Sequence, residues 1–178
     1  MSFSGNPDEL GQWRGYGSNG LGCCVVTEVD EIWKAADLAG WIVYDPKKQS
    51  AFAYKILQAL RKQTDDDVIE QVLVTAASFM KHEGFSPEME YRLLKFPSLD
   101  KIKFRESGDR LVPFVDYLEG ERPLPISRVI IGPGWQLANL SSTELSRHHV
   151  VQGIQRLLTA RKLHSTAIFA SRIPYDPR

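Results

Sequence analysis

The sequence has few residues of the kinds that form disulfides or metal sites. Its 178 residues include two cysteines and four histidines. Cys23 and Cys24 are adjacent, and neighbouring residues of a strand point to opposite faces, so we expect no bond between them. Two small apolar side chains in a reduced compartment are the simplest interpretation. The histidines show no metal-ligand spacing, and the sequence therefore predicts no metal site.

An excess of charge of one sign is also missing. Lys plus Arg and Asp plus Glu both number 22, whereas a nucleic-acid binder usually carries a basic excess. No apolar run approaches the roughly 20 residues that span a bilayer. The first residues lack the basic start and the apolar stretch of a signal peptide. We therefore expect a cytoplasmic protein that binds neither nucleic acid nor membrane, with a length that fits a single domain over residues 1–178.

The apolar pattern predicts an α+β fold, with a mixed, mostly antiparallel sheet and about four helices. Helices are indicated where apolar residues recur every three or four positions, at 30–40, 50–63, 65–83 and 141–163. Runs rich in β-branched or alternating apolar residues predict strands at 21–29, 41–45, 88–96, 101–107, 110–119, 126–131 and 165–171. A hairpin is expected at 107–109. The order strand, helix, strand predicts that 126–131 and 166–171 pair in parallel.

A glycine-rich stretch, "DELGQWRGYGSNGLG" (8–22), is the first candidate for a ligand site. Gly15, Gly17 and Gly20 have the intervals of the dinucleotide fingerprint G-x-G-x-x-G. That fingerprint follows a strand and opens a helix, whereas these glycines precede a predicted strand. We therefore reject a Rossmann-type interpretation. Glycines still permit a ligand to approach the backbone closely, so the loop stays a candidate.

Three side chains in this stretch are suited to binding a flat or anionic ligand. The rings of Trp13 and Tyr16 can stack on such a molecule, and Arg14 can bind a phosphate or carboxylate with two hydrogen bonds. The alternative is that both aromatic residues pack in the core while Arg14 pairs with Asp8 or Glu9. The sequence leaves both interpretations open.

A second candidate is "SPEMEYR" (86–92), which is predicted to be extended. In a strand, Glu88, Glu90 and Arg92 share one face, while Met89 and Tyr91 lie on the other. Two carboxylates on one face can repel each other and raise a pKa, or bind a cation or sugar hydroxyls. A solvated outer face is the alternative. Similarly, "IGPG" (131–134) could present backbone N–H groups to a ligand or be a plain turn.

Several stretches together resemble one family of bacterial proteins, classed as domain of unknown function 2971. The chain's "SFSGNPDELGQWRGYGSNGLG" resembles its "CFS…D…L-x-x-W…YG…G-x-G" block, and "EMEYRLL" its "E-x-E-[WY]-R" segment. In addition, "ISRVIIGPG" is similar to its "I…I…GP" strand and "ASRIPYDPR" to its terminal "S-x-[IV]-P-[YF]-R". The matches keep their order over residues 2 to 176.

Two departures from the family pattern concern the start of the chain. Family members usually begin with a further strand, helix and "N-D-P-x-E" loop, for which this sequence has no counterpart. Ser2 also stands where the family usually has cysteine. We expect a shortened member, a mis-started reading frame or a fragment.

The family resemblance implies a function by analogy with ADP-ribosyltransferase-like folds that consume NAD. In that analogy Glu88 or Glu90 is the catalytic glutamate that bonds a ribose hydroxyl, Tyr16 or Trp13 stacks on the nicotinamide ring, and Arg14 binds phosphate. The expected protein is then a nucleotide-handling enzyme with its site between residues 12–22 and 88–92, with Arg92 beside the carboxylates. The alternatives are a non-enzymatic ligand- or protein-binding module, accessory to bacterial stress or phage defence, and a structural remnant of a truncated gene.

Overall fold

A computed structural model describes residues 1–28, 32–117, 125–136 and 143–174. By their internal contacts these residues divide into two compact units. Unit 1 comprises Met1–Asn6 and Ala39–Leu93, and unit 2 comprises Pro7–Leu38 and Leu94–Arg178. The α+β fold is confirmed, and the prediction of a single domain stays a prediction.

Unit 1 is built on a three-stranded sheet in the order β1-β4-β3. Strand β1 (Ser2–Ser4) pairs antiparallel with β4 (Glu90–Leu94), and β3 (Leu38–Trp41) lies on the other side of β4. Trp41 and Tyr91 meet edge to face with ring centroids 5.0 Å apart. Tyr91 is therefore on the face opposite Glu90 and Arg92, as the alternation of a strand predicts.

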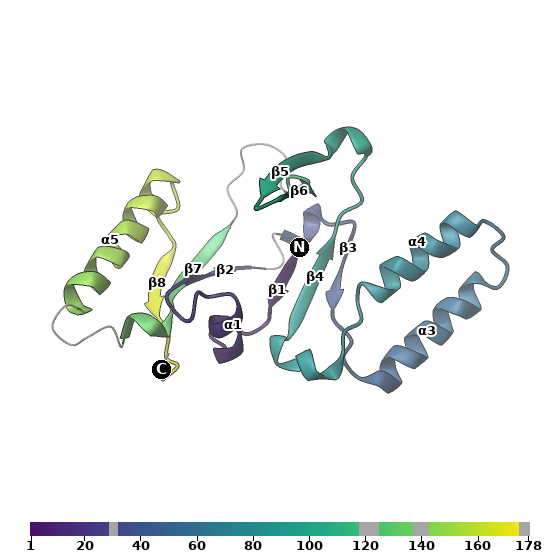
Figure 1. Cartoon of the computed structure of the whole chain (residues 1–178), viewed down its shortest axis with the longest axis horizontal. Coiled ribbons are helices and arrows are strands. Elements are labelled where there is room, and N and C mark those ends of the chain that lie inside the picture. Colours follow the sequence, from purple (N-terminus) through teal and green to yellow (C-terminus); the bar gives the residue numbers. More distant parts are fainter. Residues whose placement is uncertain (29–31, 118–124, 137–142, 175–178) are drawn as a thin grey trace. The chain divides into compact units, whose positions relative to one another are not determined.

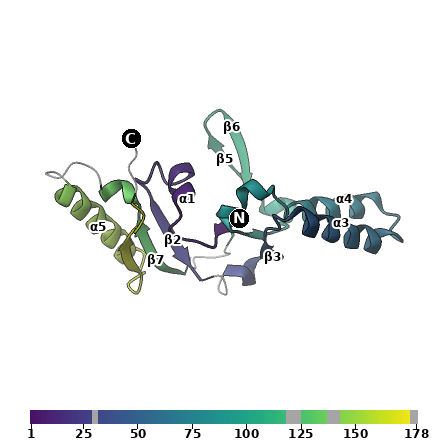
Figure 2. The same cartoon turned by 90° about the horizontal axis from the view of Figure 1, so that it is seen from below.

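Two helices, α3 (Pro46–Leu60) and α4 (Asp66–Ala77), lie side by side in unit 1 (Figures 1 and 2). Asp45 caps α3 by accepting from the N–H groups of Lys47 and Lys48, with Pro46 in the first turn. Asp65 caps α4 in the same way. Both are typical helix starts, since proline needs no N–H donor there and a carboxylate satisfies two. Helix α3 therefore begins four residues before the predicted start at residue 50.

Unit 2 contains a mixed three-stranded sheet in the order β2-β7-β8. Strand β2 (Cys23–Thr27) is antiparallel to β7 (Ile126–Ile131), which is parallel to β8 (Ala167–Ala170). The predicted parallel pairing is thus confirmed. Helix α5 (Thr143–Ala160) makes the connection and lies along β8 in Figure 1. The predicted start of this helix at residue 141 lies outside the described residues.

Unit 2 also contains a short helix α1 (Leu10–Gly15) and a two-stranded hairpin of β5 (Lys103–Ser107) and β6 (Arg110–Phe114). Ser107 pairs with Arg110, and Gly108 adopts φ 62°, which confirms the predicted turn. Short 3₁₀ helices cover Trp33–Ala35, Glu83–Glu88, Leu99–Lys101 and Pro133–Gln136. The described residues therefore form two three-stranded sheets and a hairpin instead of one mixed sheet.

The predicted helix over 30–40 is wrong in its described part. Only Trp33–Ala35 forms a 3₁₀ turn, and β3 begins at Leu38, where the sequence predicted helix. The side chain of Asp37 accepts a hydrogen bond from the N–H of Phe96 at 2.6 Å. Pairing of the following residues in the sheet outweighs the helical pattern, because strand formation depends on cross-strand contacts more than on intrinsic preference.

Candidate functional site

The glycine-rich loop is held by contacts between two stretches of backbone within unit 2. The N–H groups of Gly132 and Gly134 donate to the carbonyl oxygens of Gly22 and Gly20, each at 2.9 Å. A Cβ atom on Gly132 would lie 2.2 Å from the oxygen of Gly20, so no other residue fits there without moving backbone. The N–H groups of Gly132 and Gly134 are therefore used inside the protein, which favours the plain-turn interpretation of "IGPG".

Trp13 is buried and hydrogen-bonded within unit 2. Its side chain is 3% exposed, and its indole nitrogen donates to Asp8 Oδ1 at 2.8 Å. The hydroxyl of Ser171 donates to the same oxygen at 2.6 Å, and the N–H of Arg172 donates to Oδ2 at 2.8 Å. Burial alone would raise the pKa of Asp8, but these hydrogen bonds outweigh it and hold the pKa below its ordinary value. The arrangement fits the packing alternative for Trp13.

Arg14 and Tyr16 are the accessible part of the predicted ligand loop. Both are exposed, Tyr16 to 77%. Two residues further on, Ser18 and Asn19 adopt left-handed backbone with φ of 50° and 53°. A residue other than glycine costs roughly 1–2 kcal/mol in the left-handed region. Contacts of the neighbouring glycines therefore have to offset this cost. Residues 14–19, which run from the end of α1 through the following turn, hold most of the exposed residues of this stretch, and we call them the exposed loop.

Four charged side chains of unit 1 form a second candidate, which we call the charged cluster: Lys81, Glu88, Glu90 and Arg92. The predicted strand over 88–96 is shorter than expected, because Glu88 ends a 3₁₀ helix and Met89 has φ 43° before β4 begins. Glu88 therefore does not share a strand face with Glu90 and Arg92. Its carboxylate reaches the cluster through an ion pair with Lys81.

Glu90 lies at the centre of the charged cluster. Its Oε1 accepts from Arg92 Nε at 2.9 Å and from Arg92 Nη2 at 2.6 Å, and its Oε2 lies 3.3 Å from Lys81 Nζ. The remaining nitrogen of Arg92, Nη1, donates to the carbonyl of Ser78. Only 8% of the Glu90 side chain is exposed, so the expectation of a solvated outer face is wrong for this residue.

The charges in this cluster compensate one another. Burial would raise the pKa of Glu90, but hydrogen bonds from Ser2, Arg92 and Lys81 outweigh it and lower the pKa below the ordinary 4.5. The hydrogen bond to Glu88, opposed by burial, raises the pKa of Lys81. Each of the two carboxylates is paired with a cation, Glu88 with Lys81 and Glu90 with both Arg92 and Lys81. Glu90 is an ionised carboxylate with its oxygens already bound by the chain.

The predicted site residues thus fall in two places. Trp13, Arg14 and Tyr16 belong to unit 2, while Glu88, Glu90 and Arg92 belong to unit 1. Sequence analysis missed Lys81, which it placed at the end of a helix over 65–83. It also missed the role of Asp8 as the carboxylate that binds Trp13. Neither contact follows the periodicity of a helix or a strand, so the sequence pattern gave no signal for it.

Other features that chemistry could use are few within the described residues. Over 1–28, 32–117, 125–136 and 143–174, no group of three or more His, Cys, Asp or Glu side chains could hold a metal ion. In the same part of the chain, every buried side-chain nitrogen or oxygen has a hydrogen-bond partner. None of the described helices has both the length and the apolar character needed to cross a bilayer.

The described part of the chain is a mixed α+β protein. Its clustered glycines and the carboxylates of the charged cluster make contacts within the fold. The model of the family described as protein of unknown function (DUF2971) matches residues 12–93, so this part of the chain is similar to that family. The matched range runs from α1 to β4 and includes all the predicted site residues. No curated protein and no solved structure gave a match.

Proposed function

We propose that this protein is a non-enzymatic binding module that contacts another molecule through the exposed loop, residues 14–19. The observation that carries the proposal is the state of Glu90, whose two carboxylate oxygens are bound by Arg92 and Lys81. A carboxylate committed in this way stabilises the fold and has little capacity left to bond a ribose hydroxyl. An accessory role in bacterial stress or phage defence belongs to this proposal.

The design of the loop supports the same proposal. Its base is fixed by Trp13 and by the paired glycines, while Arg14 and Tyr16 are exposed. Tyrosine and arginine are enriched in protein contact surfaces because they combine a large contact area with directional hydrogen bonds. A rigid base with exposed side chains of these types suits recognition without requiring a reacting group.

The second candidate is an NAD-consuming enzyme of the ADP-ribosyltransferase-like class, with Glu90 as its catalytic glutamate. One observation favours it: the pKa of Glu90 is lowered, so the carboxylate stays ionised at neutral pH and could stabilise positive charge as nicotinamide leaves. NAD is then the consumed cofactor, with nicotinamide as the leaving group.

Nicotinamide release and thermal stability, measured on the same variants, separate the two candidates. The chain is incubated with NAD, and released nicotinamide is quantified by chromatography for the wild type, Glu90→Gln and Glu83→Gln. Glu83 is an exposed carboxylate on the neighbouring turn and is the matched control. A binding module gives no nicotinamide, and Glu90→Gln lowers its melting temperature while Glu83→Gln does not. Turnover that Glu90→Gln abolishes at unchanged stability would overturn the binding-module proposal.

Ligand binding at the exposed loop has its own test. Thermal-shift titrations with NAD, ADP-ribose and ATP compare Arg14→Ala with Arg156→Ala, an exposed arginine of α5. A nucleotide at about 100 times its dissociation constant stabilises by roughly 2.7 kcal/mol. A nucleotide that binds at the exposed loop gives such a shift in the wild type and in Arg156→Ala, and loses it in Arg14→Ala. Flat titrations on a chain that unfolds cooperatively contradict nucleotide binding.

A further inference from the structure

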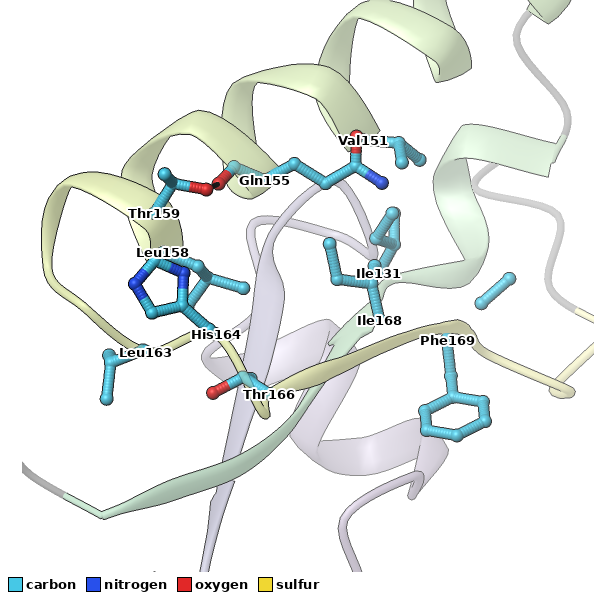
Figure 3. A pocket seen from close by; sticks show the side chains of 11 residues that line it. Ile131, Val151, Gln155, Leu158, Thr159, Leu163, His164, Thr166, Ile168 and Phe169 are labelled. Carbon is cyan, nitrogen blue, oxygen red and sulfur yellow. Dashed lines mark hydrogen bonds between the residues drawn. The ribbon is translucent and has the colours of Figure 1, made fainter.

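A cavity of about 440 Å³ lies in unit 2 between α5 and the β7–β8 part of the sheet (Figure 3). Most of the residues that line it have apolar side chains and come from helix and strand, among them Ile131, Val151, Leu158, Leu163 and Ile168, although polar atoms contribute at least as much of its surface. The polar groups around it are Gln155, Thr159, His164 and Thr166. Pockets of roughly 300–1,000 Å³ with apolar walls and a few polar groups are typical of small-molecule sites.

The turn that follows α5 shapes one end of the cavity. Lys162 adopts a left-handed conformation with φ 59°. The N–H of Leu163 donates to the carbonyl of Leu158 at 2.9 Å, and that of Lys162 to Thr159 at 3.0 Å. These two bonds form a Schellman motif, in which the residue after the turn packs against the last turn of the helix. The motif therefore places Leu163 beside Leu158 and brings His164 to the cavity.

Two polar side chains at this cavity remain available for a ligand. The hydroxyl of Thr166 donates to the carbonyl of Ile126 at 2.7 Å, and that of Thr159 to the carbonyl of Gln155 at 2.9 Å. In contrast, the amide of Gln155 and the ring of His164 make no hydrogen bond to the described part of the chain, and both lie at the cavity in Figure 3. Between them they can donate and accept hydrogen bonds.

The lining also limits the charge of a ligand. Among the described residues that line the cavity there is no Lys, Arg, Asp or Glu. A charged group that enters it loses part of its hydration and meets no opposite charge on these residues in return. The chemistry therefore favours a neutral molecule with an apolar body against Leu158 and Ile168 and a hydrogen-bonding group toward Gln155 and His164.

We propose that this cavity binds a small neutral molecule with an apolar body and an amide-like or N–H group. The site uses none of the residues on which the binding-module proposal depends, so it goes beyond that function. It also differs from a nucleotide site, because no cation of the lining could bind a phosphate.

Amide chemical shifts of the isotope-labelled full chain test the proposal with three probes. Benzamide and indole are neutral, and benzoate has the benzamide ring with a charged group. We expect saturable shifts in residues 155–170 with a neutral probe, and at least about tenfold weaker binding of benzoate, since an unpaired charge costs more than 1.4 kcal/mol to bury. Absence of a saturable response to both neutral probes, or an equal response to benzoate, overturns the proposal.

Variants of α5 locate the response. Gln155→Leu removes the exposed amide that faces the cavity, and Gln152→Leu removes an amide of the same helix that does not line it. Loss of one hydrogen bond weakens binding by about two- to tenfold. We expect this loss of benzamide affinity in Gln155→Leu and unchanged affinity in Gln152→Leu, with thermal melts reporting that both variants fold. Equal affinity in the two variants would remove Gln155 from the site and contradict the proposal.

Discussion

Unit 2 has a contact between Gly20 and Gly22 and Gly132 and Gly134, which we call the glycine contact, and unit 1 has the charged cluster. Both have residue types that indicate ligand sites, and in both these residues bind other parts of the chain. In the glycine contact, Gly20 and Gly22 receive hydrogen bonds from Gly134 and Gly132 because no side chain intervenes. In the charged cluster, the carboxylate of Glu90 is buried, and its ion pairs with Lys81 and Arg92 offset its loss of hydration. A glycine cluster or a buried carboxylate can therefore be needed for contacts within the fold, and its presence alone does not indicate a ligand.

The charged cluster should give the larger loss of stability when it is broken. Replacing Glu90 by Gln leaves Arg92 and the partly buried Lys81 with one carboxylate fewer, and breaking a buried pair from one side costs about 3–5 kcal/mol. Urea unfolding measures this loss. The exposed control Glu83→Gln should change the free energy of unfolding by less than about 0.5 kcal/mol. Equal values for the two variants would show that the cluster contributes nothing.

The glycine contact should respond to a single added methyl group. Gly132→Ala places a Cβ atom against the backbone of Gly20, which cannot move aside like a flexible side chain. Overpacking typically costs about 1–3 kcal/mol, and we expect a value toward the upper end. Circular dichroism melts of this variant measure the effect. A loss below about 0.5 kcal/mol would mean that the two stretches of backbone separate easily and that the contact does not hold the loop.

Lowering the pH should remove the stabilisation that Glu90 contributes to the folded protein. The pKa of Glu90 in the folded protein lies below its ordinary 4.5. Its stabilisation is therefore present above pH 4.5 and is lost as the pH falls through the folded value. Unfolding free energies measured against pH should fall less steeply for Glu90→Gln than for wild type, by up to about 1.4 kcal/mol per pH unit. Parallel curves would show that Glu90 titrates alike in both states.

Gly153 is a glycine without close neighbours and serves as the contrast to Gly132. A Cβ atom on Gly153, in the interior of α5, would meet nothing within 4 Å. Alanine is favoured over glycine in a helix interior by roughly 1 kcal/mol. Gly153→Ala should therefore raise the melting temperature, whereas Gly132→Ala lowers it. A fall for both substitutions would indicate that α5 is not helical at this position.

The sequence carried enough information for the fold class and the parallel β7–β8 pair, because local periodicity and chain order determine them. It left open whether Trp13 is buried, and it did not indicate the carboxylate of Asp8 that binds Trp13 and also accepts from Ser171, 163 residues away. It placed Glu90 and Arg92 on one face correctly. It missed Lys81, which changes the cluster from two repelling carboxylates to a compensated network, because tertiary contacts leave no periodic pattern.

A double-mutant cycle between Glu90 and Arg92 tests whether the charged cluster stabilises the fold. The free energies of unfolding are measured for wild type, Glu90→Gln, Arg92→Gln and the double variant, and the coupling energy is taken from the four values. Paired residues in one network couple by about 0.5–3 kcal/mol, and we expect a value in the upper half of that range. A coupling near zero would contradict the structural role of Glu90 and restore it as the candidate catalytic glutamate.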